Sequence, residues 1–200
     1  MIRVVREMLE LMVIALIMFI ATQVSVKNYR VDGSSMSATL EDGQRILVNK
    51  LVYLRFDWSP LENFFPSLAN EARAVIYPFE SPRRGDVVVF RAPMGHDVDF
   101  VKRIIALPGE TIAIRGSRVY IEGEILAEPY LNASFMQNMD SYVVPLNGYF
   151  VMGDNRYHSN DSRHWDAVPS ENIIGKAWLS YWPRYRAGFL NIGEWSLMSH

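Results

Sequence analysis

The stretch FVKRIIALPGE, residues 100–110, places one lysine inside a run of apolar residues. Its branched and aromatic residues favour a β-strand, and its last four residues are typical of a turn that ends the strand. Successive strand side chains point to opposite faces, so Lys102 shares a face with Phe100 and Ile104 while Arg103 lies on the other face. We therefore expect a strand that removes the amine of Lys102 from water.

Two interpretations of Lys102 follow from such a strand. Burial disfavours the charged form of a lysine, and a lysine that is neutral near pH 7 can act as a general base. The alternative is a lysine at a sheet edge, whose stem lies along apolar surface while its ammonium group reaches water. The strand alone favours the second interpretation, so other motifs are needed to decide the role of Lys102.

The composition is that of one globular domain with an appendage. The chain has 200 residues, 50% of them hydrophobic, and a net charge of −2, which gives no indication of a nucleic-acid partner. It has no cysteine, and its four histidines show no metal-ligand spacing. It also lacks a G-x-S-x-G motif and a glycine-rich phosphate loop. We therefore expect neither a metal nor an organic cofactor.

The N-terminus carries an uninterrupted apolar run, LMVIALIMFIAT, over residues 11–22. A single membrane anchor, a cleaved signal peptide and a buried core helix are all compatible with such a run. Because no clean small-residue cleavage site follows it, we expect an uncleaved anchor over residues 1–26. Basic residues flank the run on both sides, so charge does not settle its orientation.

The rest of the chain, residues 27–200, is predicted to be mainly β. Runs of branched and aromatic residues bounded by Gly, Pro or Asp indicate strands. We expect strands over 45–53, 86–90, 98–106, 149–152 and 177–181, and a hairpin formed by 111–114 and 119–121.

An aromatic-rich insertion near residues 54–80 separates two of the predicted strands. A short helix is possible over 61–73, although Pro66 interrupts it. The insertion is equally compatible with a surface that rests on a membrane interface and with a small core of its own.

Two polar motifs could carry chemistry. The segment VDGSSMSATL, residues 31–40, combines small residues with exposed hydroxyls, but a serine needs a base, and such a cluster is more often a plain turn. The segment GDNRYHSNDSR, residues 153–163, directly follows an apolar strand. Its polar groups are typical of a solvated loop, or they could orient a catalytic residue.

Taken in order along the chain, these motifs resemble the bacterial type I signal peptidases, which are membrane-bound Ser/Lys proteases. The resemblance rests on the apolar N-terminus and on five blocks: Gly33 to Leu40, Gly85 to Phe90, Val101 to Glu110, Gly153 to Arg163, and Ile173 to Ala177. It implies a transmembrane helix followed by an antiparallel β catalytic domain with a small β cap. It also implies a single-pass protein of the cell membrane that cleaves signal peptides from exported preproteins. Its catalytic domain would be extracytoplasmic, and its partners would be secretory preproteins and membrane lipid.

The resemblance also implies roles for individual residues. Ser35 would be the nucleophile and Lys102 its general base, with a pKa well below that of a free lysine. Ser159 would form a hydrogen bond with the amine of Lys102 and so orient that amine toward Ser35. The supporting salt bridges would join Asp161 with Arg163 and Asp154 with Arg103.

The oxyanion hole would include the backbone amide of Ser35. Some members of the family add a serine hydroxyl two residues earlier, where this chain has Gly33, so we expect backbone donation here. The chain also departs from the family at three further places: Ala38 replaces a common Pro, Tyr157-His158 replaces a common Asp-Asn pair, and Asp166 replaces a common Gly.

Two other functions compete with this interpretation. A cytoplasmic Ser/Lys self-cleaving repressor of related fold would need a DNA-binding helix-turn-helix, which the apolar N-terminus does not offer. A non-catalytic, membrane-tethered β module could bind export substrates without cutting them, although the presence of both Ser35 and Lys102 argues against it.

Overall fold

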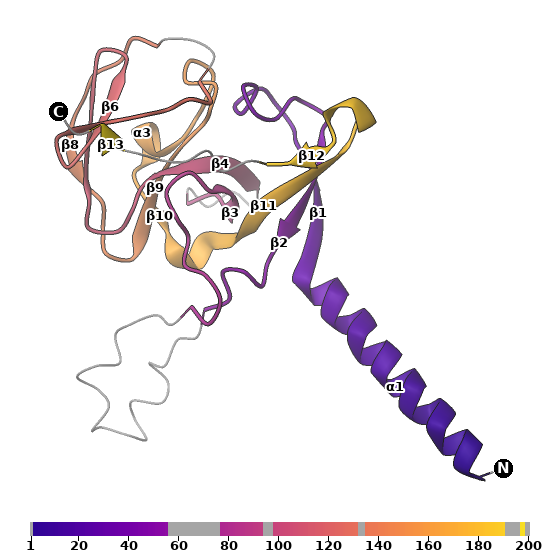
Figure 1. Ribbon diagram of the computed structural model, residues 1–200. Coiled ribbons are helices and arrows are strands. Elements are labelled where there is room, and N and C mark those ends of the chain that lie inside the picture. The colour runs from indigo at the N-terminus through magenta and orange to yellow at the C-terminus, as the bar shows by residue number, and fades with distance from the viewer. Residues whose placement is uncertain (1, 56–76, 94–97, 132–134, 191–196, 199–200) are drawn as a thin grey trace, which may run out of the picture.

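The computed structural model describes residues 2–55, 77–93, 98–131, 135–190 and 197–198. One long helix, α1 (Ile2–Ser25), leads into a body built from two antiparallel β-sheets (Figure 1). The prediction of a mainly β, antiparallel body is confirmed. Most of the predicted insertion near 54–80, including the possible helix over 61–73, lies outside the described residues.

The first sheet has eight strands in the order β1-β2-β11-β3-β4-β9-β10, with β12 paired to β11. The bounds of its strands are β1 (Val26–Arg30), β2 (Arg45–Asn49), β3 (Val87–Arg91), β4 (Asp99–Ala106), β9 (Gly148–Met152), β10 (Val168–Pro169), β11 (Ile173–Trp182) and β12 (Gly188–Phe189). The apolar runs of β3 and β9 do not alternate with polar residues, which is the pattern of strands buried on both faces.

The second sheet, which we call the cap sheet, has five strands in the order β13-β7-β6-β5-β8. The bounds are β5 (Thr111–Arg115), β6 (Arg118–Ile121), β7 (Glu124–Leu126), β8 (Met139–Val143) and β13 (Leu197–Met198). The predicted hairpin is present, because Arg115 pairs with Arg118 across a tight turn in which Gly116 has a φ of +61°.

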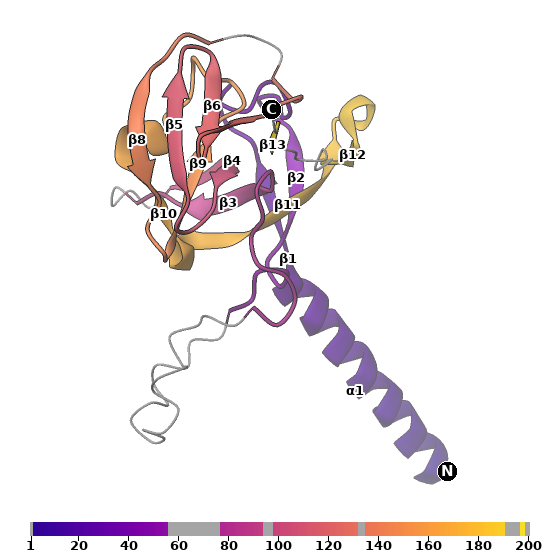
Figure 2. The ribbon, with the colours of Figure 1, turned by 60° about the vertical axis from the view of Figure 1, so that its left-hand side comes forward.

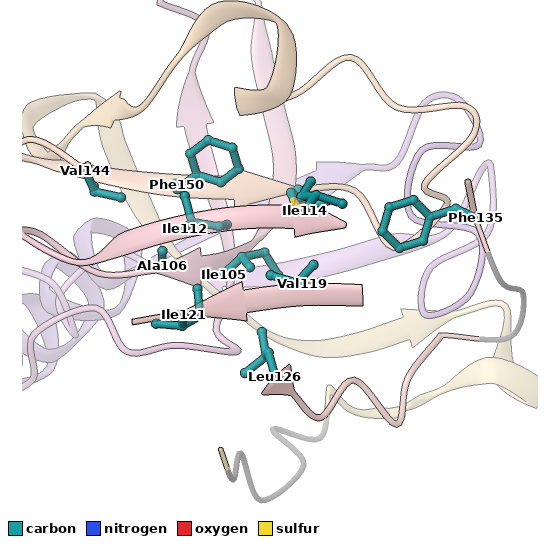
Figure 3. Packing of buried hydrophobic residues seen from close by; sticks show 11 residues of the cluster. Ile105, Ala106, Ile112, Ile114, Val119, Ile121, Leu126, Phe135, Val144 and Phe150 are labelled. Carbon is teal, nitrogen blue, oxygen red and sulfur yellow. The ribbon is translucent and has the colours of Figure 1, made fainter. Parts of the chain in front are cut away.

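A shared apolar core joins the cap sheet to the first sheet. Ile105 and Phe150 come from β4 and β9, and they pack against Ile112 and Ile121 of the cap sheet (Figure 3). All four side chains are almost completely buried. Burial of this kind contributes about 1.5–3 kcal/mol for each large apolar side chain. The cap sheet is therefore fixed against the same two strands that border the candidate site.

Two predicted strands have different bounds in the structure. The strand expected over 45–53 ends at Asn49, because the Asn49 side chain accepts hydrogen bonds from the amides of Leu51 and Val52 and turns the chain. The strand expected from residue 177 begins at Ile173. A Cβ at Gly175 would lie 2.4 Å from the carbonyl oxygen of Asn49, so only glycine permits this close crossing.

Helix α1 extends away from both sheets (Figures 1 and 2). Its apolar side chains between Val4 and Ile20 are exposed, and two ion pairs, Arg3–Glu7 and Arg6–Glu10, lie on its first turns. In the part of the chain that the structure describes, no helix has both the length and the apolarity needed to cross a membrane. The structure thus does not confirm the transmembrane helix predicted over residues 1–26.

Short helical segments complete the described chain. They are α3 (Ser162–Trp165), η2 (Ser170–Asn172) and η3 (Arg184–Arg186). Helix α3 begins just after Asp161, whose side chain caps it by accepting a hydrogen bond from the amide of Arg163. The polar motif over residues 153–163 is therefore a folded loop that ends in a capped helix.

Candidate active site

Ser35 lies in the turn between β1 and β2, and this turn is fastened to the core by its apolar residues. Met36 and Leu40 are fully buried, and the amides of Thr39 and Leu40 both donate to the carbonyl of Met36. Gly33 has a φ of +91°, a conformation that favours glycine. Ser35 is therefore held half-exposed above two buried side chains.

Lys102 lies on β4 and reaches this turn. Its Nζ is 2.8 Å from Ser35 Oγ and 3.0 Å from the carbonyl oxygen of Val101, and the residue is only 3% exposed. The Nζ also lies 5.3 Å from the centre of the Phe100 ring, so an apolar face surrounds part of the amine. The structure thus brings together the two residues that the sequence analysis proposed as a pair.

The environment of Lys102 favours its neutral form. Burial lowers the pKa of Lys102 to about 8, and the carboxylates of Asp161 and Asp154 oppose this shift only in part. The direction is the one expected for a general base. At neutral pH a substantial minority of the molecules, of the order of a tenth, would carry an unprotonated amine.

Gly153 separates Ser159 from the turn over residues 33–40, which we call the nucleophile turn after the role that the sequence analysis expects of Ser35. A Cβ at Gly153 would lie 2.5 Å from the carbonyl oxygen of Ser35 and 2.2 Å from Ser159 Oγ, so any larger residue would push these groups apart. The amide of Asn155 supports the same turn, because it donates to Ser35 O at 2.9 Å.

Ser159 does not make the predicted hydrogen bond to Lys102. Its hydroxyl is buried and lies beside the Asp161 carboxylate, whose pKa it helps to lower, and within the described chain it makes no hydrogen bond to Lys102. Lys102 Nζ uses Ser35 and the Val101 carbonyl instead. The close packing of Ser159 on Gly153 shows that it borders the site without holding the amine.

Both predicted salt bridges are present and fully buried. Arg103 binds Asp154 in a fork, with Nε–Oδ1 at 2.9 Å and Nη2–Oδ2 at 2.7 Å, and Thr39 Oγ1 donates to the same carboxylate. Lys102 and Arg103 therefore have different partners, as expected for neighbours on opposite strand faces.

The second ion pair braces the loop behind Gly153. Arg163 binds both carboxylate oxygens of Asp161 at 2.8 Å, and Asp161 also accepts the amide of Gly153 at 2.9 Å. Burial raises the pKa of the Asp161 carboxyl, but the bonds and charge of Arg163, together with hydrogen bonds from the Gly153 amide and Ser159, outweigh burial and lower it overall. Asp161 is thus kept ionised while it positions Gly153.

Comparison with known proteins now gives the family. The model of the family described as "Signal peptidase, peptidase S26" matches residues 4–182. The chain belongs to this signal peptidase family. A probable signal peptidase I-1 of Synechocystis is 34% identical over 194 residues, covering 93% of this chain and 87% of that protein. A signal peptidase I of Leptolyngbya laminosa is 36% identical over 167 residues, covering 78% and 79% of the two chains.

Membership in the signal peptidase family makes the chain a serine endopeptidase. A crystal structure of a signal peptidase I from Enterococcus faecalis V583 also aligns with this fold. That alignment covers 48% of this chain and 97% of the other, with 34% identity and a TM-score of 0.45.

In the described chain, a backbone amide beside the Ser35 hydroxyl is available as a donor. Within the described chain, the amide of Ser35 makes no hydrogen bond, whereas the amide of Gly33 is bound to Asp42 Oδ1 at 2.9 Å. Open space surrounds the missing side chain of Gly33. The Ser35 amide therefore remains open to a ligand beside the Ser35 hydroxyl, and Gly33 adds no side-chain donor.

The departures from the usual family pattern fall around Ser35 and Lys102 and not at these two residues. Tyr157 and His158 are exposed on the loop. Asp166 has a φ of +69°, which is costly for a residue with a Cβ and explains why glycine is common at this position.

The site contains further residues that sequence analysis did not single out. Asn155 and Thr39 lie inside the two quoted motifs, so their polar side chains were a usable signal. Glu128 and Tyr130, which bind Arg156, lie in a stretch with no motif and could be found only in three dimensions.

Within the described residues, no group of three His, Asp or Glu side chains is placed to hold a metal.

We predict that Gly153→Ala lowers kcat/KM roughly 100-fold or more, because a misplacement of about 1 Å in a positioned site has that effect. The added Cβ would displace Ser35 or Ser159. Gly188→Ala is the matched control, since nothing lies within 4 Å of the added Cβ there. Steady-state cleavage of a peptide substrate measures kcat/KM for both variants. A fully active Gly153→Ala enzyme would contradict the tight packing of Gly153 against Ser35 and Ser159.

We predict that Lys102→Met abolishes cleavage but raises the free energy of unfolding at pH 7, by up to about 3 kcal/mol, as a lowered pKa implies. Between pH 8 and 10.5 the unfolded wild type binds more protons than the folded protein, so its stability rises with pH there. The advantage of the variant should therefore shrink at high pH. Urea unfolding at several pH values measures the difference in free energy of unfolding between the variant and the wild type. Lys50→Met is the control, because Lys50 is exposed.

Proposed function

We propose that this chain removes signal peptides from exported preproteins with Ser35 as nucleophile and Lys102 as general base. The observation that carries the proposal is the 2.8 Å approach of the buried Lys102 amine to Ser35 Oγ. Arginine, or a lysine open to water, would hold its proton too tightly to accept one from serine near neutral pH. The family membership supports the substrate class.

The proposed reaction is acyl transfer through an ester on Ser35. The neutral amine of Lys102 takes the hydroxyl proton as Ser35 Oγ attacks the scissile carbonyl, and the Ser35 amide binds the oxygen that becomes negative. Lys102 then gives its proton to the leaving amine of the mature protein. A water molecule, deprotonated in turn by Lys102, attacks the ester carbonyl. Lys102 then returns this proton to Ser35 Oγ as the ester bond breaks, and the signal peptide leaves with a new carboxylate.

A groove of about 390 Å³ beside the dyad supports a peptide substrate. Among its lining residues are the apolar Val31, Ile46 and Val89, together with Ser35 and Lys102. Strand β9 pairs only with residues 103–106 of β4, so in the described chain the β4 edge over residues 99–102 has no β9 partner. An extended peptide would add to this edge as a further strand, and the apolar residues of the walls would favour apolar side chains.

We further propose that α1 attaches the enzyme to the cell membrane and that the β domain works on the extracytoplasmic side, where exported preproteins emerge. In support, α1 carries a dense set of exposed apolar side chains, for example Leu11, Leu16 and Phe19 at 57–67% exposure. Leaving such a surface in water is costly, and lipid removes that cost.

We predict that Ser35→Ala and Lys102→Arg each lose cleavage of a preprotein by about a thousandfold or more. Arginine keeps the charge but gives up no proton. In the wild type, kcat/KM should rise with pH through an apparent pKa near 8, the value expected for Lys102. Gel-based cleavage in detergent over pH 6 to 10 measures these effects. Retained activity in Lys102→Arg would exclude Lys102 as the general base. An inactive wild type would favour the non-catalytic β module that binds export substrates without cutting them.

We predict that the double variant Leu16→Asp/Phe19→Asp floats poorly with liposomes while it still cleaves a short soluble peptide, because only the lipid contact is lost. Leu146→Asp is a matched control, since Leu146 is 86% exposed and lies on the β domain. If the α1 variant floats with liposomes as well as the wild type does, the proposal that α1 attaches the enzyme to the membrane is wrong.

A further inference from the structure

A third buried arginine, Arg156, lies directly behind the proposed dyad and has no part in the mechanism above. Its side chain is 2% exposed and binds Glu128, whose side chain is 7% exposed. Both terminal nitrogens of Arg156 donate to the Glu128 carboxylate, one of them at 3.1 Å, and Nη2 also donates to the hydroxyl of Tyr130 at 2.9 Å. The charge of Arg156 is therefore fully paired inside the protein.

Glu128 and Tyr130 belong to the loop that follows β7 of the cap sheet. The Tyr130 hydroxyl donates to Glu128 Oε1 at 2.5 Å, and burial raises the pKa of Tyr130 well above its usual value, so this donor keeps its proton. The ring of Tyr130 also lies 4.2 Å from the guanidinium carbon of Arg103. The loop thus contacts two buried arginines at once.

Arg156 transmits this contact to the nucleophile. Its Nε donates to the carbonyl of Gly153 at 3.1 Å, and Gly153 packs on the backbone of Ser35. The neighbouring Asn155 binds the same turn twice, through its amide to Ser35 O at 2.9 Å and through its side chain to Ser34 O at 3.1 Å. The segment from Gly153 to Arg156 is therefore held at one end by the nucleophile turn and at the other by the cap sheet.

We infer that Glu128 and Tyr130 are positioning residues for the proposed Ser35–Lys102 reaction, because they orient Arg156 and through it the Gly153 segment that supports Ser35. A forked arginine–carboxylate pair fixes direction as well as distance. A single point charge or a neutral pair would leave the Gly153 carbonyl free to move. The cap sheet would thus act on the rate of cleavage without touching the substrate.

This inference rests on the proposed dyad, so the experiment first establishes that dyad with the inactive variants Ser35→Ala and Lys102→Arg. Three cap variants are then compared in the full-length enzyme: Glu128→Gln, Tyr130→Phe and the double variant Glu128→Leu/Arg156→Met. The double variant replaces the ion pair with apolar side chains, a change that usually preserves or increases stability when such a pair is buried. Glu110→Gln is the control, because it breaks the partly buried Arg84–Glu110 pair, which has no contact with Gly153.

The expected result is a fall in kcat of about tenfold or more in Glu128→Gln and in the double variant, with KM nearly unchanged, since the substrate groove is untouched. Tyr130→Phe keeps the ring over Arg103 and should lose only a few-fold. Thermal unfolding followed by circular dichroism should show the double variant as stable as wild type, so its low kcat would not reflect unfolding. Wild-type kcat in a stable double variant would overturn the inference, as would an equal loss in Glu110→Gln.

Discussion

The proposed chemistry depends on keeping the amine of Lys102 out of water. The residue is 3% exposed, and this burial lowers its pKa to about 8 although two carboxylates act in the opposite direction. Burial of a lysine is costly, so the surrounding structure must be rigid enough to maintain it. The sheets, the nucleophile turn and the loop after β9 all contribute to burying this amine.

Buried ion pairs provide that rigidity around the site. Arg103–Asp154, Arg163–Asp161 and Arg156–Glu128 all have side chains exposed by 7% or less. Desolvation offsets much of the energy of such pairs, so they add little net stability. Their forked geometry instead fixes directions, and each pair fastens residues of the 153–163 loop to β4, to the cap sheet or to the loop itself. The loop therefore keeps one conformation beside Ser35.

Much of this arrangement could be predicted from the chain alone. Apolar runs and turn residues located the central strands, and the alternation along β4 correctly separated Lys102 from Arg103. The family resemblance also implied that Asp154 pairs with Arg103 and Asp161 with Arg163. Strand ends were less predictable: a side-chain bond at Asn49 stops β2, and a close crossing at Gly175 lengthens β11. The first effect is local but shows no distinctive pattern in the sequence, and the second depends on a neighbour that is distant in sequence.

The sequence by itself determined the type of protein, because local patterns encode strands, and the order of its motifs encodes the family. Only the tertiary structure decided how the site is supported. It showed that Ser159 packs on Gly153 and does not bind Lys102, and that Glu128 and Tyr130 reach the nucleophile turn through Arg156. The bonds of Arg156 to Glu128 and Tyr130 join residues 28 and 26 positions apart, and they arise from how two sheets pack, which no local pattern records.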